Sequence, residues 1–414
     1  MTGLIKKASS LFFLIFTASL LCSAIHYDAI VANDGTGTHA SIGDALRDIP
    51  ANYSQRHVIF VKNGSYNEKI RIENDHVTLL GESREGTTIW YDQLKTDWDS
   101  HRDYEGPAVV NIHADDVILS RLTIENTQPL VGKDAFAIYS SGTRTILSQC
   151  TVNNSGSNSV QLYNTKNGLY YINNCHFSGA VDFVKVCGNA LIENSTFFQH
   201  EAIGSLWHGA FNNENEKVVV KNCLFDGVEH FFLGRHHYDA CYYFLNCRFS
   251  EKMADKAIYR KTYNDQDNNR PHFYADRHYF HQCEKEGEAY SWYQNNLNHL
   301  QPEAINIGWI YQNQWDPLQS AEIHVVGFRI FNGRYLLEFD QQVSLTTPLI
   351  LKTTSGKILK FEKGRGRNIL SFVSNEKLNS EDLKTDFTLI EGTIIPVSAH
   401  LHYQQANTLS NLKK

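Results

Sequence analysis

A short segment recurs along the middle of the chain, and this recurrence restricts the fold more than any other feature of the sequence. Five of its six copies place an asparagine or glutamine directly before a cysteine or serine, and each copy continues as a short strand-forming run. The copies lie 20 to 28 residues apart, which indicates a repeat architecture whose units bury their apolar faces by stacking on one another. We therefore predict an all-β domain, a right-handed parallel β-helix. The copies begin at Leu122, Gln149, Asn174, Asn194, Asn222 and Asn246.

An aspartate follows the third copy of this repeat. It lies on an outer face of the predicted β-helix, where a purely structural repeat needs no charged residue. The segment SGAVDF runs from Ser178 to Phe183 and contains Asp182. A carboxylate on the solvent side of a ladder of short strands contributes little to the apolar core. We therefore expect Asp182 to have a chemical role rather than a packing role.

Charge and hydropathy exclude two classes of partner. The chain has 414 residues, a net charge of −7 and no run of basic residues, which argues against nucleic acid. Residues 1–24 combine Lys6 and Lys7 with an apolar stretch from Leu11 to Leu21, as in a secretory signal peptide. No other segment approaches the length and apolar character of a membrane helix. We expect an exported monomer without a membrane partner, located outside the cell or in the periplasm.

The cysteines predict a buried stack rather than disulfides. Eight cysteines less Cys22 of the expected signal peptide leave seven, an odd number that excludes a complete disulfide set. Four of them occupy the same place in the repeat, where free cysteine packs as a small apolar residue. No CxxC pair is present, and the nineteen histidines are scattered apart from His236-His237, so we expect no metal site. The four stacked residues are Cys150, Cys175, Cys223 and Cys247.

The chain divides into two expected domains. In the first, which covers residues 25–318, the sequence predicts a helix from Ser41 to Asp48 and strands over residues 57–72 and 77–82. After Pro317 the apolar runs are short and about ten residues apart, which is typical of a small β-sandwich. We expect this immunoglobulin-like module over residues 319–407, followed by a frayed polar tail over residues 408–414.

Several motifs in one order resemble the pectinesterase family of carbohydrate esterases, the pectin methylesterases. The resemblance covers residues 29 to about 250, with a weaker match at Trp315 to Pro317. It implies the β-helix fold and hydrolysis of the methyl esters of pectin or a related polyuronate, without a cofactor. The motifs are VANDGTGTHASIGDALRDIP, VIFVKNGSYNEKIRI, VTLLGE, LTIENT, SGAVDF and the LGR of Leu233 to Arg235.

The two central residues of that chemistry are present. Ester hydrolysis needs a nucleophile or an activated water, donors for the oxyanion and an acid for the leaving methoxide. The resemblance makes Asp182 the nucleophile and Arg235 its partner. A guanidinium grips a carboxylate with two donors and lowers its pKa. The alternative for this pair is an ordinary surface salt bridge.

The general acid of the family is missing from its usual place. In the family, a Gln-Asp-Thr sequence lies on the preceding turn of the β-helix, here called a rung. Its glutamine donates to the oxyanion and its aspartate is the general acid. Here the corresponding stretch, Ser159 to Tyr163, has no carboxylate, and either Gln161 or Val160 takes the place of the acid. One rung earlier, Asp134 stands where the family has a second glutamine. The two groups could have exchanged rungs, with Asp134 as acid and Gln161 as amide donor, or Asp134 could be a solvated loop residue.

Five further residues are candidates for substrate contacts. Lys185 could bind a neighbouring uronate carboxylate, and Tyr163 and Trp207 could replace an aromatic platform that the family has after LGR. His208 or His237 could bind substrate or carry a proton, since imidazole titrates near neutral pH.

Two other functions remain open. A polysaccharide-binding protein without catalytic activity would keep the cleft and lack the acid. A polysaccharide lyase or hydrolase of the same fold would need calcium ligands or an aspartate pair on adjacent rungs, and the sequence shows neither.

Overall fold

The computed structural model describes residues 27–51, 56–209, 213–264, 269, 272–317, 325–345, 349–353, 355–364, 367–378, 387–391, 394–396 and 408–409. The expected signal peptide and the expected domain boundary at residues 318–319 both lie outside these ranges. Within the described residues, no helix has the length and apolar character needed to span a bilayer.

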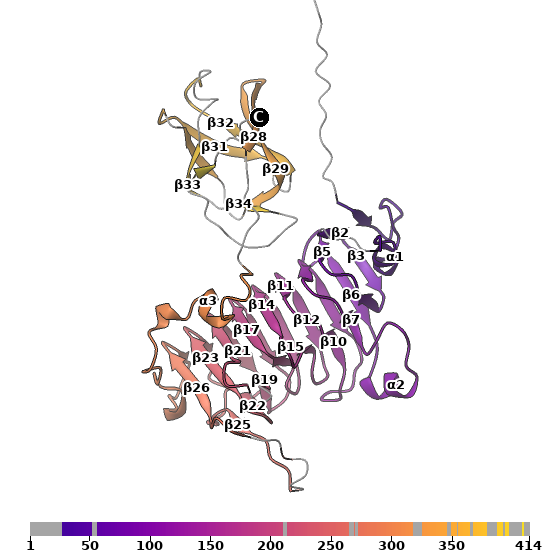
Figure 1. The fold of residues 1–414 in the computed structure, drawn as a ribbon, viewed down its shortest axis with the longest axis vertical. Helices are drawn as coiled ribbons and strands as arrows, with labels where there is room; N and C mark the ends of the chain where they lie inside the picture. The colour runs from indigo at the N-terminus through magenta and orange to yellow at the C-terminus, as the bar shows by residue number, and fades with distance from the viewer. Residues whose placement is uncertain are drawn as a thin grey trace, which may run out of the picture.

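Residues 29–285 form the predicted parallel β-helix, in which the chain winds through three parallel sheets (Figure 1). Successive turns add one strand to each sheet, so residues far apart in sequence stand in register on one wall. This architecture confirms the predicted fold class. The ten-stranded sheet consists of β1 (Ala29–Val31), β2 (His57–Val61), β5 (Val77–Gly81), β8 (Ile118–Ser120), β11 (Thr145–Ser148), β14 (Leu169–Asn173), β17 (Asn189–Glu193), β20 (Val218–Lys221), β23 (Cys241–Leu245) and β26 (Arg277–His281).

The other two walls have the same parallel order. The eight-stranded sheet consists of β4 (Ile70–Ile72), β7 (Ala108–Ile112), β10 (Phe136–Ser140), β13 (Val160–Tyr163), β16 (Val184–Cys187), β19 (Gly204–His208), β22 (Phe232–His236) and β25 (Tyr259–Arg260). The nine-stranded sheet consists of β3 (Gly64–Asn67), β6 (Thr87–Tyr91), β9 (Thr123–Asn126), β12 (Thr151–Asn154), β15 (His176–Gly179), β18 (Thr196–Gln199), β21 (Leu224–Gly227), β24 (Arg248–Phe249) and β27 (Glu284–Lys285).

Short helices lie outside the ladder. The predicted first helix is confirmed as α1 (Ile42–Arg47), where the Ser41 hydroxyl accepts a hydrogen bond from the Asp44 backbone NH at 3.1 Å. The remaining helices are α2 (Lys95–Ser100), η2 (Ser291–Tyr293), η3 (Pro302–Ala304) and α3 (Ile307–Ile310). After the last rung, the chain returns along the ten-stranded sheet, where the Tyr311 hydroxyl donates to the Tyr170 carbonyl oxygen at 2.7 Å.

The recurring amides mark the bends, as the sequence predicts. Asn174, Asn194, Asn222 and Asn246 all adopt left-handed backbone conformations with φ of 53° or 54°, which asparagine tolerates better than most residues. Their side chains continue the ladder, since Asn222 donates to Asn194 and Asn246 donates to Asn222, each at 3.3 Å. These asparagines therefore have two roles. Their backbone forms the sharp turn of each rung, and their side chains hydrogen-bond from one rung to the next.

The residues after these bends point into the core. Cys150, Cys175, Cys223 and Cys247 are buried and free, which confirms the predicted stack. Burial raises the pKa of the Cys247 thiol well above its ordinary value.

We expect these four thiols to react with a thiol reagent only after denaturation, because all four side chains are buried and inaccessible to the reagent in the folded chain. Thiol titration with and without guanidinium chloride measures this directly. Detection by mass spectrometry of disulfides among the four would contradict the stack.

The C-terminal residues form a separate antiparallel sheet, in agreement with the all-β module expected there. One part of the expectation is wrong, because Thr408 and Leu409 are not part of a frayed tail but pair with Thr388 and Phe387. The strands are β28 (Val325–Phe331), β29 (Arg334–Leu345), β30 (Ile350–Thr353), β31 (Ile358–Lys363), β32 (Arg367–Val373), β33 (Phe387–Glu391), β34 (Ile394–Pro396) and β35 (Thr408–Leu409).

Candidate active site

One column of outward-facing residues crosses the eight-stranded sheet and contains four of the nine predicted site residues. In a parallel ladder, residues in register on neighbouring strands stand about 4.8 Å apart, so a column forms a continuous surface. The members of this column are Arg71, Asn111, Tyr139, Gln161, Lys185, Trp207, Arg235 and Tyr259.

Asp182 occupies a special backbone position at the entry to β16. Its φ is 48°, a left-handed conformation that is uncommon for residues other than glycine. The next two residues, Phe183 and Val184, enter the apolar core with no exposed surface. The turn thus anchors the chain on one side of Asp182 and directs its carboxylate to the outer wall.

Arg235 holds the Asp182 carboxylate from two rungs away. Its Nε donates to Oδ1 at 2.8 Å and to Oδ2 at 3.0 Å, while Nη2 donates to Oδ2 at 2.8 Å. The intervening rung has Gly204, and a Cβ there would stand 3.3 Å from Cγ of Arg235. A glycine at this position therefore leaves room for the arginine side chain to cross the rung and fix the carboxylate with two donors.

Asp182 is more buried than the sequence suggested. Only 6% of its surface is exposed, so the expectation of a solvated wall carboxylate is wrong, because the Arg235 side chain lies against it. Burial raises the pKa of Asp182 above its ordinary value, while the hydrogen bonds and charge of Arg235 act in the opposite direction. The expectation of a net lowered pKa is therefore wrong as well, since desolvation is the larger effect.

Asn158 lies opposite Asp182, on the preceding rung. The Asn158 backbone NH donates to the Val181 carbonyl oxygen at 2.9 Å, and Val160 pairs with Val184 two positions later. This register places Asn158 opposite Asp182, whereas Val160 and Gln161, the two candidates for the place of the family acid, lie two and three residues farther along the chain. Asn158 also shares the left-handed backbone, with φ of 57°.

Asp134 lies on the next rung out and contacts this amide. It pairs with Ser157 in a parallel bridge, and its Oδ1 accepts hydrogen bonds from the Ser157 hydroxyl and from Asn158 Nδ2, the latter at 2.9 Å. Two rungs separate the backbones of Asp134 and Asp182, which corresponds to about 9.5 Å. Asn158 therefore hydrogen-bonds Asp134 on one rung and lies in register with Asp182 on the other.

Gln161 and Lys185 stand side by side on the same wall, next to two aromatic rings. The Lys185 ammonium lies 5.2 Å from the ring centre of Tyr163 and 5.1 Å from that of Trp207, within cation–π range. In the described part of the chain, Lys185 forms no ion pair with a carboxylate. The two aromatic rings thus position the Lys185 ammonium group, which is available to an anionic ligand. Gln161 is buried beside it.

The two candidate histidines differ sharply. His208 has no exposed surface, and its ring nitrogens contact the backbone: Nε2 lies 3.2 Å from the Gly188 oxygen and Nδ1 accepts from the Cys241 NH at 3.0 Å. Burial lowers the pKa of His208 to about 3. A substrate or proton-transfer role for His208 is therefore wrong, whereas His237 is half-buried, with its ring centre 6.1 Å from that of Trp207.

The sequence analysis missed Asn158 and Gly204. A signal for Asn158 exists, because SGSNSV at residues 155–160 parallels SGAVDFV at residues 178–184 with one residue inserted. The role of Gly204 leaves no such signal, since it depends on which rung lies between Asp182 and Arg235.

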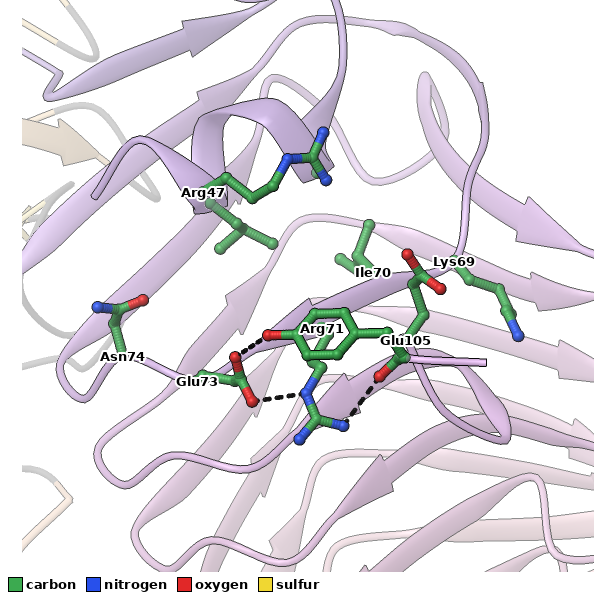
Figure 2. A pocket seen from close by; sticks show the side chains of 10 residues that line it. Arg47, Lys69, Ile70, Arg71, Glu73, Asn74 and Glu105 are labelled. Atoms are coloured by element: carbon green, nitrogen blue, oxygen red, sulfur yellow. Dashed lines mark hydrogen bonds and ion pairs between the residues drawn. The ribbon is translucent and has the colours of Figure 1, made fainter. Parts of the chain in front are cut away.

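An open cavity of about 230 Å³ lies farther along the same sheet, at β4. Two of its cationic groups are paired: Lys69 with Asp103, and Arg71 with Glu73 at 2.7 Å. Figure 2 shows Arg71 directed at the Glu73 carboxylate, which also accepts a hydrogen bond from the Tyr104 hydroxyl. This cavity lies apart from Asp182 and contributes no nucleophile to the site.

Comparison with known proteins gives one family. The family model described as pectinesterase matches residues 28–225. Curated relatives include the pectinesterase/pectinesterase inhibitor PPE8B of Prunus persica, 27% identical over 168 residues, which are 40% of this chain and 31% of that protein. The probable pectinesterase 30 of Arabidopsis thaliana is 28% identical over 191 residues, 46% of this chain and 37% of that protein. The chain thus spans about a third of the length of these two relatives.

Solved structures show the same fold. A pectin methylesterase in complex with a hexasaccharide superposes with a TM-score of 0.59 at 21% identity, covering 71% of this chain and 99% of that one. The pectin methylesterase from carrot gives a TM-score of 0.53 at 18% identity, covering 65% and 86%.

Proposed function

We propose that this chain, which belongs to the pectinesterase family through residues 28–225, hydrolyses the methyl esters of pectin or a related polyuronate. The observation that carries the proposal is the Asp182 carboxylate held by the two-donor grip of Arg235 on the outer wall. An ion pair with only a structural role would not need the left-handed turn at Asp182 or the glycine at position 204. It would also not need the polar side chains that surround this pair. Arg235 itself lies beyond the residues that the family model matches.

In the proposed reaction, an Asp182 oxygen attacks the ester carbonyl carbon and forms a tetrahedral oxyanion. Gln161 or Asn158 donates to this oxyanion, and the C–O bond to the methoxide then breaks as the Asp134 carboxyl group transfers its proton to the leaving oxygen. Water hydrolyses the resulting anhydride, which returns the Asp182 carboxylate and leaves a free uronate. The products are methanol and the polysaccharide carboxylate, and the reaction needs no cofactor.

The surroundings of Lys185 support an anionic sugar polymer as substrate. Tyr163 and Trp207 offer flat apolar faces of the kind on which sugar rings stack, and Lys185 between them offers a positive charge for a neighbouring uronate. We include His237 in this surface because its ring packs edge-on against Trp207. A monomer acting on an extracellular polysaccharide, exported through residues 1–24, completes the proposal; no nucleic acid or membrane takes part.

The function is tested by methanol release from highly methylated pectin, measured beside binding to the same material. We expect methanol to appear in step with new carboxylates, because one ester yields one of each. De-esterified polygalacturonate is the matched control, and it should release no methanol. Binding without methanol release would instead identify a non-catalytic binding protein, and unsaturated products absorbing in the ultraviolet would identify a lyase.

A further inference from the structure

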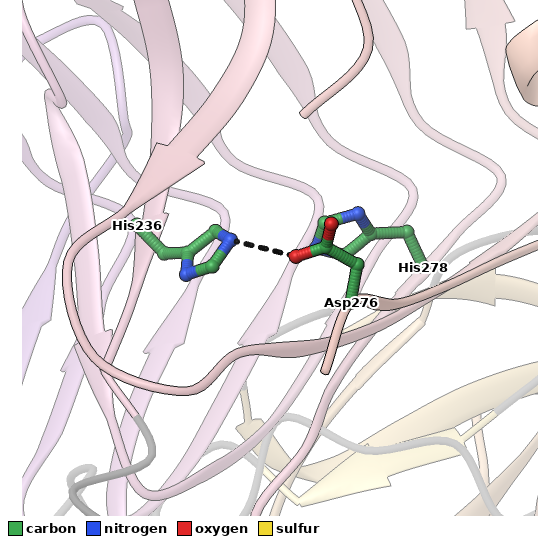
Figure 3. A group of neighbouring side chains, drawn as sticks. All are labelled: His236, Asp276 and His278. Carbon is green, nitrogen blue, oxygen red and sulfur yellow. Dashed lines mark ion pairs between the residues drawn. The ribbon is translucent and has the colours of Figure 1, made fainter. Parts of the chain in front are cut away.

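A cluster of histidines lies beside the end of β22, directly after Arg235. His236, Asp276 and His278 each offer one ligand atom, and these atoms all lie within 4.8 Å of one another. Figure 3 shows the His236 ring and the Asp276 carboxylate facing each other, with the His278 ring beside them. No metal site is expected from the sequence, because 40 residues separate His236 from Asp276 and their spacing matches no metal-binding motif.

His236 is arranged as a metal ligand rather than as a hydrogen-bond donor. Its Nδ1 lies 2.6 Å from the Tyr238 carbonyl oxygen, so the ring proton sits on Nδ1 and is donated there. Its Nε2 then presents a lone pair, which has no hydrogen-bond partner among the described residues, and the ring has no exposed surface. Histidines that bind metals commonly donate their other nitrogen to a carbonyl or carboxylate in this way.

The lone pair of His236 faces an oxygen that is also an acceptor. Nε2 lies 3.5 Å from Oδ1 of Asp276, and two acceptors at this distance need a cation between them. Two ligands at about 2.0–2.1 Å from a tetrahedral Zn²⁺ stand about 3.3 Å apart. The observed separation therefore fits an ion that binds both.

The surrounding groups support the same geometry. His272 Nε2 lies 3.7 Å from Oδ1 of Asp276 and has no hydrogen-bond partner in the described part of the chain. The segment that carries it is fixed by the buried Asp239 carboxylate, which accepts from the backbone NH groups of Phe273 and Tyr274 at 2.9–3.0 Å. His278 has a buried Nε2 that also lacks a partner among these residues.

We propose that His236, Asp276 and His278 bind a divalent transition-metal ion such as Zn²⁺, with solvent in the fourth position and His272 beside the site. Imidazole nitrogens with one carboxylate form a ligand set suited to Zn²⁺ rather than to Ca²⁺ or Mg²⁺, which prefer oxygen. The ion has a structural role: it fastens the segment before β26 to the end of the strand that carries Arg235. The Asp276 side chain is 63% exposed, which gives the ion a path from solvent.

The test uses the full chain after treatment with EDTA. Calorimetric titration with ZnCl₂ should show one strong site per chain, and CoCl₂ should give the visible absorption of a four-coordinate nitrogen and oxygen site. Asp276→Asn keeps the shape of an exposed side chain, so it should fold, yet it should weaken Zn²⁺ binding at least about tenfold, since loss of even an orienting partner costs this much. Glu288→Gln, another exposed carboxylate, is the matched control and should bind as the unmodified chain does.

A second variant separates this site from adventitious binding by surface histidines. His278→Gln should also weaken Zn²⁺ binding and remove the cobalt absorption, while Zn²⁺ should raise the Tm of the unmodified chain and of Glu288→Gln only. Equal Zn²⁺ affinity in Asp276→Asn, His278→Gln and the unmodified chain would overturn the proposal. So would the absence of a stoichiometric site, because a proton shared by His236 and Asp276 would then be the bridging cation.

Discussion

Asp182→Asn is expected to lower methanol release by roughly 10⁴- to 10⁶-fold, the range seen when a catalytic nucleophile or its orienting partner is removed. The amide cannot attack the ester carbonyl, although it can still accept a hydrogen bond from Arg235. Binding to methylated pectin should change little, because the wall formed by Tyr163, Lys185 and Trp207 is untouched. Initial rates of methanol release, with binding to the same pectin, measure both effects.

The asparagine variant is preferred to alanine because Asp182 and Arg235 form a buried pair. Removal of one partner of a buried ion pair leaves an uncompensated charge and costs roughly 3–5 kcal/mol of stability. Asp182→Ala could therefore lose activity by unfolding, which thermal melting would detect. The matched control is Asp226→Asn, on the neighbouring wall, which should retain full activity. Near-normal methanol release by a folded Asp182→Asn would rule out Asp182 as the nucleophile.

The repeat made the fold predictable from the sequence because its information is local. Each bend needs a residue that tolerates a left-handed backbone, and each following position needs a small buried side chain. Asn174 and Cys175 show both requirements in two adjacent letters, and their recurrence gives the stacking direction. The pairing of Asp182 with Arg235 was also foreseeable, but through motif resemblance rather than through spacing.

The remainder of the site depends on how many residues each turn contains, which the sequence does not state. Asn158 and Asp182 are 24 residues apart on adjacent rungs, while Asp182 and Arg235 are 53 apart over two. Insertions between rungs thus decide which side chains meet, and residue counts alone do not place Asn158 opposite Asp182. The meeting of His236 with Asp276 depends on a long connection between β25 and β26 for the same reason.

Asp134→Asn is expected to lower kcat by about a hundred- to ten-thousand-fold with little change in KM, the usual effect of losing a general acid. Asn158 lies in register with the nucleophile Asp182, and its amide hydrogen-bonds the Asp134 carboxylate, so we assign the amide to the oxyanion and the carboxylate to the leaving oxygen. This arrangement retains an oxyanion donor and a general acid, both of which ester hydrolysis needs. Relative to the family pattern, the two groups have exchanged rungs. Methanol release over a range of pectin concentrations separates kcat from KM.

Asn158→Asp distinguishes this mechanism from a site that has lost its acid, because the two readings predict effects of opposite sign. If Asp134 is the acid, a new carboxylate at position 158 removes the oxyanion donor and repels both Asp134 and Asp182, so activity should fall. If the acid is absent and Asp134 is only a solvated loop residue, the same change restores a carboxylate on the rung beside the nucleophile, so activity should rise. In that second case Asp134→Asn should also leave methanol release unchanged, and the exchange of rungs would be untenable.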